Sequence, residues 1–359
     1  MEGRPYDPYA TAGGRLPGLL LALAVLLAAA VVVAGVVSLS AGAPLIWQGG
    51  LNGGGEEETQ QAEGVSELNY PAEVQQTIQQ PSGDTWLLPS SAVPAEDAIF
   101  VVDTGNDRLL ELGPDGGVAA AIGGASSEGL DLQQPMALAS DGRRLFVANS
   151  MASEIVVLSL SGAVENVVRL EPLAAGEQAP RPIGVAVTAD GGIVVSDAAN
   201  HRVLILDGEG QLVRAVGTGR RASGGDGFNV PGALAVDGGG NIYVVDALNG
   251  RVVKMSADGR FLAQFGERGK TAGTLSRPKG VAVDDAGRVF VSDGLLAAVE
   301  VFAPDGKYLG VIGRKTAANP ALGSMFEAPA GLWLTGDTLY VADRFAGLIV
   351  LKLSGTPPE

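Results

Sequence analysis

The chain of 359 residues has no cysteine and a single histidine, His201. The absence of cysteine excludes disulfides, thiolate metal sites and a cysteine nucleophile, so the fold depends on none of them. One imidazole also excludes zinc sites that rely on two or three histidines. Aromatic residues make up only 5% of the chain, whereas glycine is abundant at 53 residues. This composition favours many short strands joined by glycine-containing turns over a helical bundle.

Basic residues are scarce relative to acidic ones, 24 against 40, and the formal net charge is −16. Nucleic-acid binding needs lysine and arginine to neutralise phosphates, so this charge argues against such a partner. The Gly-Gly-Asp-Gly sequence at 224–227 has no helical pattern behind it and is not a phosphate-binding loop. No cofactor is therefore predicted, although calcium stays open as an alternative because Asp, Glu and Asn are plentiful.

Residues 16–55 contain no charged side chain, and within them residues 18–39 form a nearly continuous apolar run. As a helix these 22 residues span about 33 Å, which matches a hydrocarbon core of about 30 Å. Two arginines precede the run and three glutamates follow it. The positive-inside rule therefore predicts a single-pass anchor in the cell membrane, with residues 1–17 in the cytoplasm and the chain after residue 39 outside.

A cleaved signal peptide is the alternative to this anchor, since residues 41–43, Ala-Gly-Ala, resemble a cleavage site. The apolar run is longer than that of an ordinary signal peptide, which favours the uncleaved anchor. Residues 40–71 follow as a flexible linker rich in glycine and glutamate. Both alternatives place residues 72–355, and the short tail at 356–359, outside the cytoplasm.

One pattern recurs six times along residues 72–355. An acidic or amide residue ends the second apolar run of each unit, at spacings of 46, 48, 49, 47 and 50 residues: Asp103, Asn149, Asp197, Asp246, Asp293 and Asp343. A proline precedes five of the units, at spacings of 47, 49, 47 and 51 residues: Pro135, Pro182, Pro231, Pro278 and Pro329. Two independent markers with one period of this size indicate a solenoid or a propeller.

Within each unit, alternating apolar segments are separated by turns rich in aspartate and glycine. This pattern predicts antiparallel strands, and four strands in a unit of this size form one propeller blade. The chain is therefore predicted to be an all-β, six-bladed β-propeller of four-stranded antiparallel blades, preceded by one N-terminal transmembrane helix. The last unit lacks a fourth strand, so residues 72–79 are expected to supply it and to close the ring.

Units three to five contain phrases such as NHRVLIL and PKGVAVDDAGRVFVSD, and residues 200–203 read Asn-His-Arg-Val. These phrases resemble NHL repeats, and the resemblance covers about residues 72–355. It implies a propeller fold but no particular activity, because this fold carries unrelated roles. Abundant Ala and Gly, with more Arg than Lys, are typical of a GC-rich bacterial genome.

An arginine stands five residues after the aspartate in three units, as Arg108, Arg202 and Arg251. Because the other units dispense with the arginine, these aspartates and arginines are interpreted as structural turn residues. The aspartate would cap backbone N–H groups, and the arginine would pair with carboxylates near the turn. His201 occupies the histidine position of the resembled repeat, and a lone imidazole without a nucleophile motif is weak support for catalysis.

In a propeller, the loops that lead into the blades and the turns after the second strands gather at one mouth of the channel, where a ligand is expected. The candidate ligand-binding residues there are Arg181, His201, Asn229, Arg277, Lys279 and Glu327. Further polar residues in the turns are Asn106, Asp107, Asn249 and Arg344. No catalytic or metal-binding residue is assigned.

The favoured hypothesis is a membrane-tethered, extracytoplasmic binding scaffold for a protein, peptide or glycan, and not an enzyme. The alternative is a calcium-dependent hydrolase, lactonase or lyase with its site in the channel, since some six-bladed propellers are enzymes of this kind. A channel lined by backbone and small apolar groups would favour binding. Carboxylates or amides that converge on one point of the channel would favour the enzyme.

Overall fold

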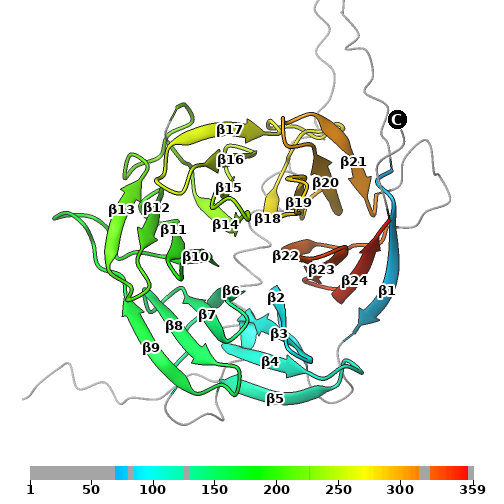
Figure 1. Cartoon of the computed structure of the whole chain (residues 1–359), viewed down its shortest axis with the longest axis horizontal. Coiled ribbons are helices and arrows are strands. Elements are labelled where there is room, and N and C mark those ends of the chain that lie inside the picture. Colours follow the sequence, from blue (N-terminus) through cyan, green and yellow to red (C-terminus); the bar gives the residue numbers. More distant parts are fainter. Residues whose placement is uncertain (1–68, 80–84, 125–129, 226, 315–323, 355–359) are drawn as a thin grey trace, which may run out of the picture. The chain divides into compact units, whose positions relative to one another are not determined.

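The computed structural model describes residues 69–79, 85–124, 130–225, 227–314 and 324–354. These residues form 24 β-strands in six four-stranded sheets. The inner strands of successive sheets contact one another in order, and the sixth contacts the first, so the sheets form a closed ring (Figure 1). The prediction of a six-bladed propeller with four-stranded antiparallel blades is confirmed.

The predicted transmembrane segment at residues 18–39 lies outside the described residues, as do the cytoplasmic tail and most of the linker. The predicted tail at residues 356–359 lies outside them too. Within the described ranges, no helix has the length and apolar character needed to cross a bilayer.

The innermost strand of every blade begins at a proline, and these strands are β2 (Pro89–Ala95), β6 (Pro135–Ser140), β10 (Pro182–Val187), β14 (Pro231–Val236), β18 (Pro278–Val283) and β22 (Pro329–Thr335). Proline has no N–H to donate, and the first residue of a strand at the edge of a sheet tolerates this loss. The second strands end at aspartate or asparagine: β3 (Ala98–Asp103), β7 (Arg144–Asn149), β11 (Ile193–Asp197), β15 (Ile242–Asp246), β19 (Val289–Asp293) and β23 (Thr338–Asp343). The proline pairs with that terminal residue, so both mark the same end of the blade.

The third strands are β4 (Arg108–Leu112), β8 (Glu154–Ser159), β12 (Arg202–Leu206), β16 (Arg251–Met255), β20 (Ala298–Phe302) and β24 (Gly347–Leu353). The outermost strands are β5 (Val118–Gly123), β9 (Val164–Arg169), β13 (Leu212–Val216), β17 (Phe261–Phe265), β21 (Tyr308–Ile312) and, in blade six, β1 (Ala72–Ile78). A short 3₁₀ turn, η1 (Thr104–Asn106), follows β3. All residues of β11 are buried, whereas most of β13 is exposed, so burial decreases toward the rim of the ring.

The hydrophobic core lies between the blades. Six clusters of buried apolar side chains join neighbouring blades within the described part of the chain, one at each junction. Between blades four and five, for example, Tyr243 and Phe265 belong to the same cluster as Val289 and Phe302. Because each sheet is covered on both faces, its middle strands consist of nearly continuous apolar residues.

The beginning of the described chain closes the ring. β1 pairs antiparallel with β24 and completes the sixth sheet, which confirms the closing strand predicted at residues 72–79 (Figure 1). Tyr70 extends this closure to blade five, since its N–H donates to the Val311 carbonyl at 2.9 Å. Its ring also packs edge-on against Phe290. One N-terminal segment therefore connects the last two blades.

Each inner strand is irregular directly after its proline. In blade five the register shifts between Pro278 and Val281, and Lys279 lies within the irregular stretch. The other five blades show a shift at the same place. Such bulges change the direction in which a side chain points. Gly280 follows, and a Cβ there would collide with the Ala330 carbonyl of the next blade.

Candidate binding site at the channel mouth

The residues that end the second strands hold the loops that lead into the blades. All six are fully buried: Asp103, Asn149, Asp197, Asp246, Asp293 and Asp343. Each accepts hydrogen bonds at 2.6–3.0 Å from backbone N–H groups that lie 15–17 residues earlier in the chain. A side-chain oxygen at this position thereby fixes the loop over the channel mouth in every blade.

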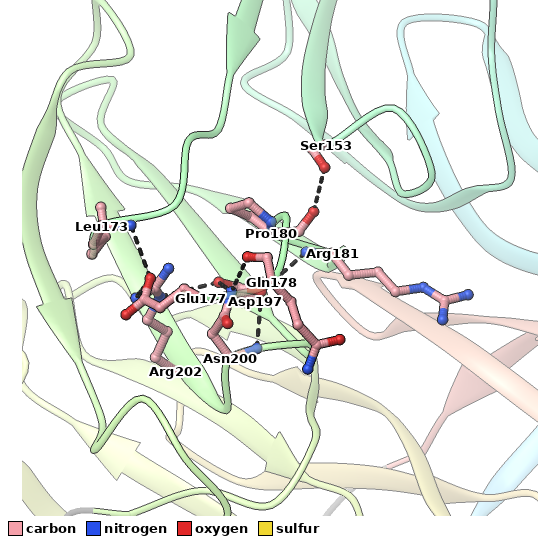
Figure 2. Close-up of polar contacts among 9 residues, drawn as sticks. All are labelled: Ser153, Leu173, Glu177, Gln178, Pro180, Arg181, Asp197, Asn200 and Arg202. Atoms are coloured by element: carbon pink, nitrogen blue, oxygen red, sulfur yellow. Dashed lines mark hydrogen bonds and ion pairs between the residues drawn. The ribbon is translucent and has the colours of Figure 1, made fainter. Parts of the chain in front are cut away.

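Three blades satisfy the buried carboxylate with an arginine and an asparagine. Around Asp197, Arg202 donates from Nε to Oδ2 at 3.0 Å and Asn200 donates from Nδ2 to the same oxygen at 2.8 Å (Figure 2). The N–H of Arg181 donates to Oδ1 at 3.0 Å, and Arg202 also contacts Glu177 at 2.9 Å. The same ion pair recurs at 2.8 Å in blades one and four, as Asp103–Arg108 and Asp246–Arg251.

The other three blades satisfy this position without an arginine. Asp293 accepts four backbone N–H groups, from residues 276 and 277 on Oδ2 and from residues 295 and 296 on Oδ1. Asp343 accepts an equivalent set of four. Asn149 is neutral and needs no cation, because Oδ1 accepts one N–H and Nδ2 donates to a carbonyl. Backbone donors or an amide therefore replace the arginine where it is missing.

His201 joins blade three to blade four. Its backbone is in the left-handed region, with φ of 51°, and its Nδ1 accepts the N–H of Val230 at 3.0 Å. Burial, and next the charge of Arg221, lower the pKa of His201, which favours the neutral imidazole that this acceptor role requires. Asp107 makes the equivalent contact between blades one and two, since its carboxylate accepts the N–H of Gln134 at 2.7 Å.

The other candidate ligand residues are dispersed around the mouth. The Arg181 guanidinium points away from the Asp197 cluster (Figure 2). It donates to the side chain of Gln134 at 2.8 Å. Asn229 donates its N–H to Asp246 at 2.7 Å. Glu327 is exposed and donates its N–H to the carboxylate of Asp343. Only Arg277 and Lys279, of the six predicted residues, belong to one cluster of charged side chains at the channel.

The inner strands of all six blades enclose a cavity of about 350 Å³. Backbone and small apolar side chains form most of its wall, among them Ala137, Ala233 and Ala282. Trp333 of β22 lines the cavity near the end of its strand and packs against apolar clusters of blades one to three. Its indole therefore crosses the channel at the end away from the prolines. Within the described residues, no three His, Asp or Glu side chains are placed to hold a metal ion.

Arg277, Lys279 and Arg344, which we call the basic cluster, lie at the mouth between blades five and six. Lys279 and Arg344 line the cavity, and Arg277 is exposed beside them. Burial, and next the charges of Arg344 and Arg277, lower the pKa of Lys279 to about 8, and Asp293 opposes this effect. Burial lowers the pKa of Arg344 as well, and Arg277 adds to the effect. Three positive charges therefore crowd one side of the opening.

The cavity-lining members of the basic cluster form no ion pair in the described part of the chain, and Asp293 is the one carboxylate that attracts the charge of Lys279 there. Neither the Lys279 ammonium nor the Arg344 guanidinium forms a hydrogen bond or ion pair there, and Arg344 Nε is also shielded from solvent. Burying a charged group without a partner is unfavourable. The mouth therefore offers two partly buried cations to an incoming anion.

Exposed apolar side chains surround the same mouth. Met151, Leu248, Leu295 and Phe345, which we call the apolar rim, are 59%, 45%, 52% and 67% exposed. Each stands two residues after the buried aspartate or asparagine of its blade. In blade one this position is Gly105, and the side chain of Leu87 lies over it. The rim was not predicted, although reading the position two residues after each aligned aspartate would have revealed it.

The architecture defines the class of the protein, which is a six-bladed β-propeller with a channel and a mouth formed by loops from every blade. Residues 180–206 match the family model of the NHL repeat. The chain is thus a six-bladed β-propeller with an NHL repeat at residues 180–206, as the resemblance at residues 200–203 implies. No curated protein matches the sequence.

Solved structures share the fold at low identity. One is a catalytically inactive variant of virginiamycin B lyase from Staphylococcus aureus with quinupristin, at 13% identity and a TM-score of 0.55 over 79% of this chain and 100% of that chain. Another is a protein of unknown function from Bacteroides thetaiotaomicron, at 12% identity and a TM-score of 0.60 over 80% of this chain and 73% of that chain. At such identities the likeness is one of fold.

Proposed function

We propose that this protein is a membrane-tethered, extracytoplasmic binding scaffold whose propeller recognises a protein, peptide or glycan at the channel mouth. Residues 18–39 would anchor the chain, and residues 40–68 would hold the propeller away from the lipid, since the last part of the predicted linker, with Tyr70, packs on blade five. A flexible coil of about 29 residues has a root-mean-square span of roughly 30 Å, which is enough to clear the headgroups.

The apolar rim carries this proposal. Its four large apolar side chains surround a concave opening, and they recur at one position of the repeat instead of being scattered over the surface. Apolar groups exposed around a polar centre are typical of surfaces that bind another molecule. Among the three partner classes, a protein or peptide fits such a rim best, because aliphatic and aromatic groups gain most from apolar partners.

The lining of the channel favours binding over catalysis, because backbone and small apolar groups form most of the wall. The likeness to virginiamycin B lyase transfers no activity to this chain, since at 13% identity it concerns the fold alone. The binding hypothesis therefore remains the favoured one.

Cross-linking on intact cells tests the proposal. In the rim variant, serine replaces Met151, Leu248, Leu295 and Phe345 of the full chain. The amount of partner that this variant captures should be at least about tenfold lower than the amount captured by the wild type, because buried apolar contacts dominate such interfaces. The matched control replaces four exposed apolar residues of the outermost strands: Val164, Leu212, Val213 and Leu262. Equal capture by both variants would refute a binding role for the mouth.

The absence of cysteine makes the predicted topology easy to test. Glu165 is exposed on β9, so Glu165→Cys introduces a single thiol on the surface of the propeller. A membrane-impermeant maleimide should label this variant on intact cells as completely as it does after lysis. Labelling only after lysis would place the propeller in the cytoplasm and overturn the proposed location.

A further inference from the structure

Comparison of equivalent positions in the six blades shows which charged residues the fold requires and which occur in one blade only. The position after the proline of each inner strand lines the cavity in all six blades, and its occupants are Ser90, Met136, Ile183, Gly232, Lys279 and Ala330. The position after the buried aspartate or asparagine holds Thr104, Ser150, Ala198, Ala247, Gly294 and Arg344. Each position carries one cation and five neutral residues. The fold therefore requires no charge at either position.

The two cations come from adjacent blades and converge on one junction, although their positions are 65 residues apart in the sequence. In blade one the equivalent residues are satisfied within the ring: the Thr104 hydroxyl donates to Ser90 Oγ at 2.7 Å, and Ser90 donates to the Met136 carbonyl at 2.8 Å. Lys279 and Arg344 have no such partners in the described residues. An unsatisfied pair that the fold does not need indicates a ligand.

We propose that the basic cluster is a subsite for the side-chain carboxylate of an acidic residue in a peptide segment that lies across the channel mouth. This inference rests on the proposed function and specifies the partner as a peptide with apolar residues on both sides of an Asp or Glu. An arginine binds a carboxylate through two parallel hydrogen bonds, and a neighbouring lysine adds a compact charge.

The positions of the rim residues favour a segment that crosses the mouth. Met151 belongs to blade two and Leu295 to blade five, and these blades face each other across a ring of six. A peptide that contacts both places its middle over the channel. A side chain that points down from the middle then reaches Lys279 and Arg344 at the cavity wall.

The charges of the protein favour a peptide over an anionic membrane surface. The formal net charge is −16, and Glu327 is exposed at the same mouth. A planar array of lipid headgroups would meet these negative charges along with the cations. A single carboxylate that enters the cavity meets the local positive charge and leaves most of the negative surface in solvent.

Two pentapeptides test the subsite on the full chain in nanodiscs of neutral lipid: acetyl-Ser-Leu-Glu-Leu-Ser-amide and its Gln counterpart. The Glu peptide should bind at least about tenfold more tightly, because charge-assisted hydrogen bonds are lost with Gln. It should also slow acetylation of Lys279 at pH 7.5, measured by mass spectrometry. Lys307, exposed in the turn at the opposite end of blade five, should react at an unchanged rate.

Substitutions within the basic cluster test whether it causes the preference for the Glu peptide. Lys279→Met and Arg344→Met should each weaken binding of the Glu peptide at least about tenfold and leave binding of the Gln peptide unchanged. Thermal melting checks that both variants fold. A Glu peptide that fails to protect Lys279 at millimolar concentration overturns the inference, and so does equal binding of the two peptides.

The remaining outcomes distinguish this inference from the proposed function. A peptide whose only carboxylate is its free C-terminus is compared with the Glu peptide, and tighter binding of the former contradicts a side-chain subsite. Binding to phosphatidylglycerol vesicles that depends on Lys279 contradicts a peptide as the occupant. Partner capture that needs the apolar rim, combined with no preference for Glu over Gln, would leave the scaffold intact and remove only the subsite. A preference for Glu over Gln without rim-dependent capture would support the subsite and remove the apolar rim as the binding surface of the scaffold.

Discussion

Replacement of Lys279 by methionine should make the protein more stable. Methionine keeps the length of an unbranched side chain and removes a charge that lies partly buried beside Arg344 and Arg277. In the wild type this charge is desolvated and repelled, and only Asp293 attracts it. The substitution therefore removes an unfavourable interaction without opening a large cavity.

The magnitude follows from the pKa of Lys279, which falls from its ordinary value of 10.5 to about 8. At 1.36 kcal/mol per pKa unit, this change corresponds to an upper limit of about 3 kcal/mol of destabilisation at neutral pH. Solvent at the mouth screens part of the repulsion, so we expect a gain of about 1–2 kcal/mol in the free energy of unfolding. For a domain of this size, that gain should raise the melting temperature by about 2–8 °C.

The dependence on pH gives a sharper test, because the sign of the effect is determined. Between pH 8 and 10.5 the unfolded chain keeps the Lys279 proton that the folded chain has released. The contribution of Lys279 to stability therefore rises with pH across this window, and its full cost is present below pH 8. Other groups titrate in this range too, so the quantity to measure is the difference between wild type and Lys279→Met.

Urea denaturation of both proteins from pH 7 to pH 10.5 supplies this difference. The advantage of Lys279→Met should be largest at pH 7 and should shrink steadily above pH 8. A variant that is less stable than the wild type at pH 7 would show that Lys279 has a stabilising partner. A difference that does not vary with pH would show that the lysine is not desolvated.

Three further substitutions or deletions test the structural interpretation. Deletion of residues 70–78 should lower the melting temperature strongly, because it leaves β24 as an unpaired edge. The control Val74→Ala, at an exposed position of β1, should leave the melting temperature unchanged. Equal melting curves for the deletion variant and the wild type would disprove the closure. Asn149→Asp should lower the free energy of unfolding by about 2–4 kcal/mol, measured by urea denaturation, because it buries a carboxylate without a cation. Adding Glu154→Arg at the paired position should restore the lost stability. His201→Ala should lower the free energy of unfolding by about 1 kcal/mol, because the N–H of Val230 loses its acceptor. An unchanged stability would show that His201 Nδ1 does not accept this hydrogen bond.

The blades were predictable because their signals are local and repeated. Short apolar or alternating runs bounded by turn residues mark the strands, and the aligned positions of Pro278 and Asp293 recur at a nearly constant spacing. The closing strand followed from counting, since the sixth unit lacked its fourth strand. Its observed bounds, Ala72–Ile78, differ from the prediction by one residue.

The chemistry of the mouth was less predictable, because it depends on contacts across the ring. Lys279 was one of six candidates of equal standing, and its neighbour Arg344 becomes adjacent only when blade six packs against blade five. The missing arginines of blades five and six also had no explanation in the sequence. Backbone N–H groups replace them at Asp293, and no residue type reveals such donors.

The repeat itself permits a final test of whether geometry or local detail determines the subsite. Ile183 and Ala247 occupy, at the junction of blades three and four, the positions that Lys279 and Arg344 occupy at the junction of blades five and six, and both line the same cavity. In a chain that carries Lys279→Met and Arg344→Met, the substitutions Ile183→Lys and Ala247→Arg should restore preference for the Glu peptide over the Gln peptide. Arg181 already stands at the position of Arg277, so restored preference would mean that cations at equivalent positions of adjacent blades suffice. No preference in a transplanted chain that still melts cooperatively would mean that the particular loops of blades five and six are indispensable.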